Sequence, residues 1–214
     1  MRFVCGPIPP SRVLNPQAEG WTPLREWGAG RLAVFALLLG LPFLLAALNL
    51  LVTLYGQNGP VRGLLRTQPL LGGGYLLALL AMVPVHELIH GLAYGQGIGS
   101  PHLIVGVLAE PGPLLAIYDS PMPRNRVLGV LAAPFLTLSL LPLLCLPWLE
   151  GTAWSLVLAY SLLHAAICGG DLIVFLRLVS QVPRMASIHN NGWQTYWIAQ
   201  GGSGHAERRT ADGD

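Results

Sequence analysis

Residues 70–94 read LLGGGYLLALLAMVPVHELIHGLAY, and this stretch decides the fold class. It is long enough to cross about 30 Å of hydrocarbon as a helix, which takes about 20 residues. Towards its C-terminal end it nevertheless carries His86, Glu87 and His90. An ionisable side chain inside a membrane helix costs about 3 kcal/mol or more, so three of them together need a reason. The stretch therefore predicts a membrane helix that carries a polar site.

The chain as a whole is also apolar, although less so than this stretch. Of its 214 residues 53% are hydrophobic and 10% are charged, and the mean hydropathy is +0.56. A soluble domain carries about 25% charged residues, so lipid must cover much of this surface. Four stretches are long and apolar enough to span a bilayer: 33–55, 70–94, 127–148 and 154–179. We therefore predict an all-α integral membrane protein with about four transmembrane helices.

The polar residues gather at the two ends of the chain and suggest three segments. We expect a polar N-terminal segment over 1–32, a four-helix membrane domain over 33–181, and a polar C-terminal tail over 182–214. The last fourteen residues, GGSGHAERRTADGD, contain too little hydrophobic surface to form a core. The tail is therefore predicted to be partly disordered.

The segment between the second and third apolar stretches has two readings. Residues 102–118 contain two short runs rich in apolar residues, separated by Glu110-Pro111-Gly112-Pro113. This pattern predicts either a short β-hairpin with a Pro-Gly turn or an interfacial loop. If a hairpin forms, its edge could receive an extended substrate by strand addition.

Arginine placement predicts the orientation in the membrane. The chain has no lysine, and its arginines stand singly or in pairs, which gives no basic patch for nucleic acid. If both termini are in the cytoplasm, Arg62 and Arg66 are the only arginines on the outer side of the membrane. The positive-inside rule therefore favours an N-in, C-in topology.

His86-Glu87-Leu88-Ile89-His90 is the strongest chemical signal in the chain. Residues four apart share one face of a helix, so both imidazoles can reach a single ion. Glu87 is offset by one position and can act as a general base on a water molecule at that ion. Two histidines with a carboxylate favour Zn²⁺ over other divalent metals. The alternative is a buried polar network that ties helices together.

Asp171 is the candidate for the third metal ligand. A catalytic zinc site takes three protein ligands and keeps one position open. Of the ten acidic residues, only Glu87 and Asp171 lie inside the predicted spans. Alternatively, Asp171 pairs with an arginine such as Arg177 or begins a broken helix end.

An intramembrane HExxH motif with an aspartate on a later helix resembles the site-2 protease group of intramembrane zinc metalloproteases. The small size, the four spans and Gly170-Asp171 resemble a bacterial family of zincin-type membrane peptidases of unknown function. The resemblance covers about residues 70–177 and implies a zinc peptidase with His86, His90 and Asp171 as ligands. The aspartate here follows Cys-Gly-Gly, whereas site-2 proteases place it in an Asn-Pro…Leu-Asp-Gly context.

His164 has three readings. It precedes Asp171 by seven residues, which in an unbroken helix separates the two by about 10.5 Å along the axis. One ion cannot readily bind both, so His164 could contact substrate or a developing oxyanion, orient a ligand, or simply pack between helices. We do not expect His102, His189 or His205 to bind the catalytic metal.

These features predict a membrane-embedded zinc-dependent endopeptidase of the bacterial cytoplasmic membrane, with Glu87 as its catalytic base. Its expected partners are membrane lipid and a peptide or membrane-protein substrate, and its site is expected towards the cytoplasmic side. Two alternatives stay open. A non-proteolytic metal-binding scaffold would not need Glu87, and an ion transporter is less favoured because no internal repeat is evident.

Overall fold

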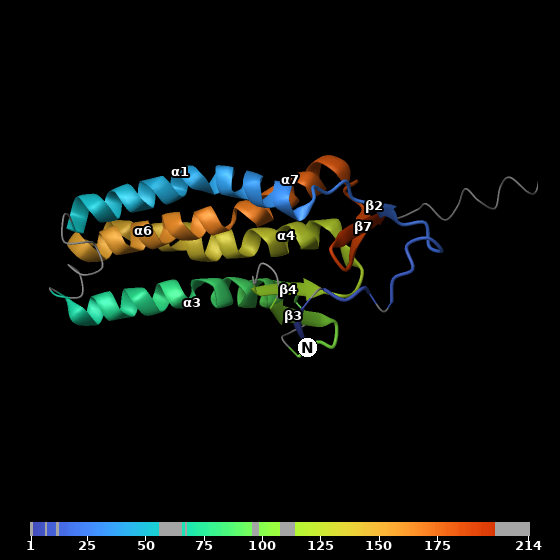
Figure 1. Cartoon of the computed structure of the whole chain (residues 1–214), viewed down its shortest axis with the longest axis horizontal. Coiled ribbons are helices and arrows are strands. Elements are labelled where there is room, and N and C mark those ends of the chain that lie inside the picture. The colour runs from blue at the N-terminus through green and yellow to red at the C-terminus, as the bar shows by residue number, and fades with distance from the viewer. Residues whose placement is uncertain are drawn as a thin grey trace, which may run out of the picture. The chain divides into compact units, whose positions relative to one another are not determined.

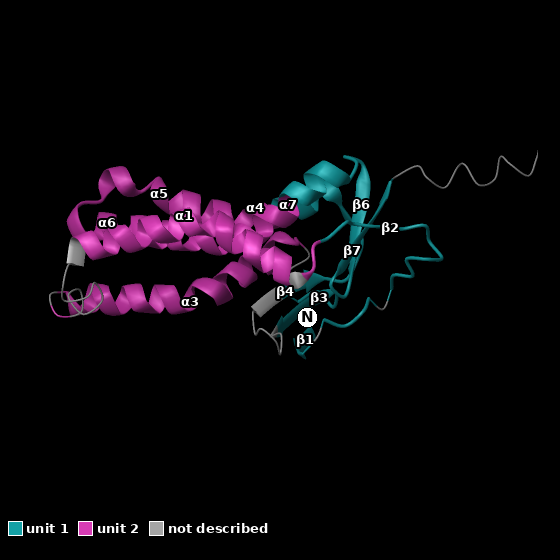
Figure 2. Ribbon diagram, turned by 45° about the horizontal axis from the view of Figure 1, so that its top comes forward, with its two compact units in different colours: residues 1–26, 96–129, 176–214 teal, residues 27–95, 130–175 magenta. Residues whose placement is uncertain are grey.

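The computed structural model divides the chain into two compact units (Figures 1 and 2). The described residues are 2–6, 8–11, 13–55, 66, 68–95, 99–107 and 114–199. Unit 1 comprises residues 1–26, 96–129 and 176–214, and unit 2 comprises residues 27–95 and 130–175. Unit 2 consists of helices, whereas unit 1 contains the strands (Figure 2).

Unit 2 is a helical bundle arranged around α6. Its elements are α1 (Ala29–Tyr55), α3 (Pro69–Ala93), the end of α4 (Arg124–Pro134), the π-helix η2 (Phe135–Leu140), α5 (Leu141–Leu143), the 3₁₀-helix η3 (Leu146–Trp148), α6 (Gly151–Ile167) and the start of α7 (Gly169–Gln181). Helix α6 contacts α1, α3, η2, α5 and η3. It is therefore the central helix, and its inward face buries Ser161 and His164.

Three helical segments are long and apolar enough to cross a membrane. They are Gly30–Thr53, Pro69–Ala93 and Arg124–Trp148, with mean hydropathies of 2.4, 1.7 and 2.2. The third runs from α4 through η2 and α5 to η3. These segments coincide with the first three apolar stretches of the sequence.

The fourth apolar stretch forms two helices rather than one. Helices α6 and α7 are bent by 51° at Cys168, so a count of four spans holds only if this bent pair is one span. Two glycines follow the bend, Gly169 and Gly170, and glycine has a low helix propensity. The bend matters because it redirects the residues that follow it.

Polar and apolar side chains in unit 2 are distributed in the reverse of the usual pattern. Large apolar side chains face outwards, including Leu37 at 62% exposure and Leu80 at 78%. The buried side chains include His86, Ser139 and His164, the last with no exposed surface. In water this arrangement would leave an extensive apolar surface uncovered, whereas lipid would cover it.

Unit 1 contains two small sheets, so the predicted all-α fold class is wrong. One sheet has the order β1 (Arg2–Cys5), β3 (Leu103–Val107) and β4 (Leu114–Tyr118). The other has the order β2 (Thr22–Pro23), β7 (Gln194–Ala199), β6 (Ala186–Asn191) and β5 (Met122–Pro123). Strands β1, β2, β6 and β7 lie in the segments expected to be polar ends. The disorder expected for 201–214 lies outside the described residues.

Of the two readings of 102–118, a β-hairpin or an interfacial loop, the structure shows the paired strands. β3 and β4 pair antiparallel, with Leu103 opposite Tyr118 and Val105 opposite Ala116. The expected turn, 110–113, lies outside the described residues. β1 pairs parallel with the other side of β3, so an extended substrate cannot add to β3.

Two glycines allow α1 to approach α6 and the start of α7 closely. A Cβ atom on Gly40 would lie 2.5 Å from the carbonyl oxygen of Ala166, and one on Gly169 would lie 2.6 Å from that of Ala36. Real Cβ atoms are essentially never this close to a neighbour, so the two backbones meet where side chains are absent. Small residues at such contacts are typical of helix pairs in membranes.

We expect Gly40→Ala to lower the free energy of unfolding by about 1–3 kcal/mol, because the added methyl group forces the helices apart. Gly74→Ala is the matched control, since a Cβ atom there meets nothing within 4 Å. In a helix, alanine is favoured over glycine by roughly 0.5–1 kcal/mol, so the control should be neutral or slightly stabilised. Unfolding of the purified protein in graded SDS checks this. Equal stability of both variants would contradict the close approach.

Candidate metal centre

Helix α3 presents the two histidines of the HELIH motif as a pair. His86 and His90 are one helical turn apart, so both imidazoles lie on the same face, with ring centroids 4.8 Å apart. Their side chains are only 6% and 7% exposed. Glu87 is next to His86 in the same turn and is half-buried. The motif thus places two metal-binding groups and a carboxylate in one turn of a helix.

Asp171 joins the pair because the chain bends before it. Cys168 stands between α6 and α7, and its N–H donates to the carbonyl of His164 (3.1 Å). Asp171 follows in the first turn of α7, where the helix dipole favours a carboxylate. Its Oδ2 atom lies 3.1 Å from Nε2 of His86 and 3.4 Å from Nε2 of His90. Sequence reasoning selected these three residues as ligands, and the structure brings them together.

The spacing of the three ligand atoms fits zinc. Nε2 of His86 and Nε2 of His90 are 3.1 Å apart, so all three separations lie between 3.1 and 3.4 Å. Nitrogen and oxygen ligands at roughly 2.0–2.1 Å from a tetrahedral zinc lie about 3.3 Å from each other. Two imidazoles and one carboxylate are also a ligand set that zinc commonly takes. The group can therefore hold one zinc ion.

The hydrogen bonds around His90 leave its Nε2 free to bind a cation. Its Nδ1 lies 3.0 Å from the carbonyl oxygen of Val130, and a carbonyl oxygen only accepts, so Nδ1 carries the proton. In a neutral imidazole Nε2 then has a free lone pair. That lone pair faces Nε2 of His86 and the carboxylate of Asp171. Lone pairs that converge in a buried place repel one another unless a cation or a proton lies between them.

His164 contacts the other side of His86. Its Nε2 lies 3.1 Å from Nδ1 of His86, and its Nδ1 lies 2.7 Å from Oγ of Ser139. Ser139 belongs to the π-helix η2, and such segments are frequent at functional sites. Pro142 has no N–H, so the carbonyl of Leu138 has no i+4 donor there. A buried chain of three polar groups thus runs from η2 through α6 to α3.

A second group of ligand atoms shares His86. His86, His164 and Cys168 also offer atoms within 4.8 Å of one another, and the Cys168 thiol lies 3.6 Å from Nδ1 of His164. A metal held there would not contact His90 or Asp171. The group of His86, His90 and Asp171 also includes a carboxylate and both histidines of the HELIH motif, which makes it the better candidate for a metal site.

An apolar cavity adjoins His86, His90 and Asp171, which we call the metal group. Its volume is about 160 Å³, and its walls come from α1, α4, η2, α6 and α7. Asp171 is the one charged residue among those that line it. Asp171 is also the most exposed of the three ligands, at 23% of its side chain. The cavity therefore meets the metal group on the Asp171 side.

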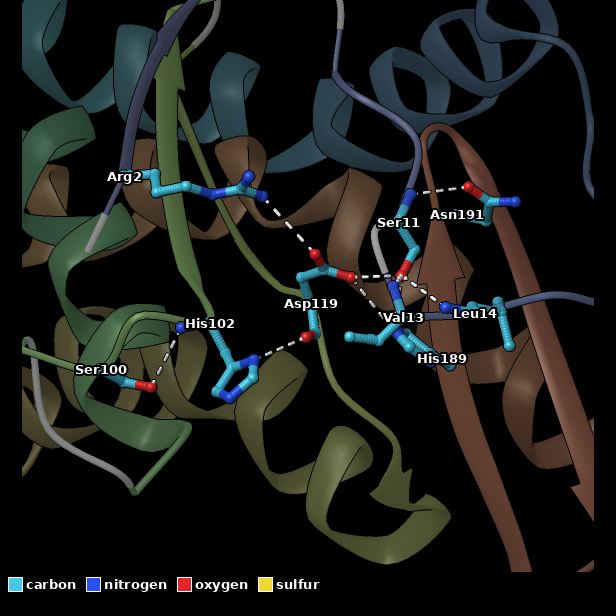
Figure 3. A network of polar contacts seen from close by, with 9 residues as sticks. All are labelled: Arg2, Ser11, Val13, Leu14, Ser100, His102, Asp119, His189 and Asn191. Atoms are coloured by element: carbon cyan, nitrogen blue, oxygen red, sulfur yellow. Dashed lines mark hydrogen bonds and ion pairs between the residues drawn. The ribbon is translucent and has the colours of Figure 1, made fainter.

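Unit 1 contains a separate polar network centred on Asp119 (Figure 3). The hydroxyl of Ser11 donates to Oδ1 of Asp119 (2.5 Å), and Nε2 of His189 lies 3.2 Å from the same oxygen. Arg2 lies 3.5 Å from the other carboxylate oxygen, and Nδ1 of His102 donates to the Asp119 backbone carbonyl. The network ties the N-terminal segment to both sheets.

This network is not a Ser-His-Asp catalytic triad. In a triad the histidine contacts serine through one ring nitrogen and aspartate through the other. Here Nε2 of His189 faces both Ser11 and Asp119, while its Nδ1 is buried without a hydrogen-bond partner among the described residues. His102 and His189 thus belong to a structural network, and His205 lies outside the described residues.

Three groups that contact His90 or His164 were not predicted from the sequence. They are the carbonyl of Val130, the hydroxyl of Ser139 and the thiol of Cys168. The Val130 carbonyl could not be predicted, because every residue has a backbone carbonyl. Ser139 could have been noticed, because it is a polar residue within the apolar stretch 127–148.

Comparison with known proteins identifies the family. A family model described as "Putative zincin peptidase" matches residues 79–186, just over half of the chain. The matched range includes HELIH, Ser139, His164 and Asp171. No curated protein and no solved structure matches the chain. The chain belongs to this family, which indicates a zinc metallopeptidase.

Proposed function

We propose that this metallopeptidase is a membrane-embedded endopeptidase of the site-2 protease type, which hydrolyses peptide bonds of membrane or membrane-adjacent substrates. The observation that carries the proposal is the convergence of His86, His90 and Asp171 on one point inside an apolar bundle. These three residues would hold zinc, and Glu87 would be the catalytic base. A zinc ion, when bound, lowers the pKa of a water molecule towards 7 and polarises the carbonyl under attack.

The proposed role of Glu87 follows from its place in the helix. Being one residue after His86, it lies beside the metal group rather than among the ligands. It accepts a proton from the attacking water as the new C–O bond forms. It then returns that proton to the amine nitrogen as the C–N bond breaks. The products are a carboxylic acid and an amine, which accounts for every atom of the water.

The proposed location is the cytoplasmic membrane of a bacterium, with both termini in the cytoplasm. Three apolar helices and the outward-facing leucines support membrane embedding. Unit 1 gathers the N-terminal segment, the segment between α3 and α4, and the C-terminal residues. Most arginines fall in these segments: Arg2, Arg12, Arg25, Arg124, Arg126, Arg177, Arg184, Arg208 and Arg209. The positive-inside rule therefore favours a cytoplasmic unit 1.

Glu87→Gln should keep the metal and lose hydrolysis, because the amide retains the size of the carboxylate but cannot accept the proton. We expect about one zinc per chain in both the wild type and the variant. Cleavage of a model transmembrane peptide in liposomes should fall roughly 10²- to 10⁴-fold. Elemental analysis and product mass spectrometry measure the two quantities.

Glu150→Gln is the matched control, because Glu150 is exposed and precedes α6. Its zinc content and cleavage rate should equal those of the wild type. Undiminished cleavage in Glu87→Gln would exclude the proposed base. A wild type that binds zinc but never cleaves peptide would favour the non-proteolytic scaffold instead.

His164→Leu should weaken zinc binding about 10- to 100-fold, because partners that orient a ligand histidine typically contribute this much. Leucine fills the space but offers no acceptor to Nδ1 of His86. His164→Gln should retain most of the affinity, because its carbonyl oxygen can accept that hydrogen bond. Competition with a chromophoric chelator gives the affinities, and the visible spectrum of the Co²⁺-substituted protein reports the ligand geometry.

Ser161→Ala is the control for a polar-to-apolar change on the same helix. Ser161 is buried, and its hydroxyl has no hydrogen-bond partner among the described residues. Its loss should leave the zinc affinity and the Co²⁺ spectrum unchanged. Equal weakening by His164→Leu and His164→Gln would mean that His164 acts by packing alone.

A further inference from the structure

The walls of the apolar cavity beside Asp171 come from several helices. Leu39 and Phe43 come from α1, Ala132 and Phe135 come from α4 and η2, and Phe175 comes from α7. Gly169 lines it as well, where the backbone of α7 approaches α1. The cavity is partly open, since Leu39 and Phe43 are 37% and 39% exposed. An apolar pocket with one charged group at its wall is the usual composition of a small-molecule or side-chain pocket.

The volume of the cavity limits what it can hold. An engineered apolar cavity of about 150 Å³ in another protein stays dry and binds benzene. The cavity here, at about 160 Å³, therefore suits one branched aliphatic or aromatic group. A full acyl chain of a phospholipid would leave most of its length outside. Water is disfavoured because the walls other than Asp171 offer few polar partners.

The cavity borders the metal group through Asp171, and this position indicates what kind of group the cavity would hold. Asp171 lines the cavity and also contacts both ligand histidines. His86 and His90 do not line it. A carbonyl group brought to the metal group from this side would have its neighbouring side chain directly over the cavity.

We propose that this cavity is a specificity subsite for a large apolar side chain of the residue next to the scissile bond. The proposal rests on the proposed peptidase function and narrows its substrates to peptides with leucine, isoleucine, methionine or phenylalanine at that place. Such residues are abundant in membrane-spanning segments. Burial of a larger side chain strengthens binding until the cavity is full.

A set of three hydroxamates tests the subsite without a known substrate. They share one zinc-binding head group and differ only in the attached side chain, which is methyl, isobutyl or naphthylmethyl. Binding to the zinc-loaded protein in lipid nanodiscs is measured by calorimetry. We expect the isobutyl compound to bind roughly 10- to 100-fold tighter than the methyl compound, and the naphthylmethyl compound to fit poorly.

Two variants change the cavity in opposite directions, from α4 and from α1. Ala132→Phe fills it and should abolish the preference for isobutyl over methyl. Leu39→Ala enlarges it and should improve binding of the naphthylmethyl compound, which keeps the proposal testable if Ala132→Phe does not fold. Ala133→Phe is the control, because the adjacent Ala133 does not line the cavity, and it should keep the wild-type order.

The outcomes separate the subsite from the peptidase site. Zinc-dependent binding of all three compounds with equal affinity would overturn the subsite and leave the zinc site standing. Absence of zinc, or of any hydroxamate binding, would overturn the zinc site and the subsite with it. A phospholipid that native mass spectrometry finds on the wild type but not on Ala132→Phe, with unchanged hydroxamate preferences, would assign the cavity to lipid.

Discussion

Three potential metal-binding atoms converge inside a helical bundle whose outer surface is apolar, and holding them together is the constraint on which the rest of the structure depends. Nε2 of His86, Nε2 of His90 and Oδ2 of Asp171 lie 3.1–3.4 Å apart. Among the described residues, no arginine side chain contacts these three atoms, so the carboxylate of Asp171 faces only the two imidazoles. A cation bound here would balance its charge, and hydrogen bonds hold both imidazoles turned towards this point. The carbonyl of Val130 serves this purpose for His90, and His164 serves it for His86.

The bend between α6 and α7 allows a residue from each of these two consecutive helices to contact the same imidazole. An unbroken helix would hold His164 and Asp171 about 10.5 Å apart along its axis. With a 51° bend at Cys168, the two residues contact opposite nitrogens of the same imidazole, that of His86. Gly169 lets α1 close over the bend, and the cavity lies at this junction. One local break thus accounts for the third ligand, the orienting histidine and the proposed subsite.

The sequence was sufficient for the parts of the site that depend on local geometry. The spacing of HELIH determines that its imidazoles share a helix face, and the scarcity of acids within the spans left Asp171 as the candidate third ligand, which the structure brings to both histidines. The role of His164 could not be chosen, because the bend depends on how Cys168, Gly169 and Gly170 pack against α1. Strands β1, β2, β6 and β7 were missed because they are short and lie in segments expected to be polar ends. A signal for the hairpin of β6 and β7 was available, since Asn-Gly is a strong turn dipeptide; the two-residue turn is formed by Gly192 and Trp193.

The central claim is that the metal is held by two imidazoles and one carboxylate, without sulfur. X-ray absorption at the zinc edge of the purified, zinc-loaded protein tests it most directly. The account predicts a first shell of nitrogen and oxygen at roughly 2.0–2.1 Å, with the multiple scattering of two imidazoles. A sulfur ligand at about 2.3 Å would contradict it, because the metal would then lie in the group formed by His86, His164 and Cys168.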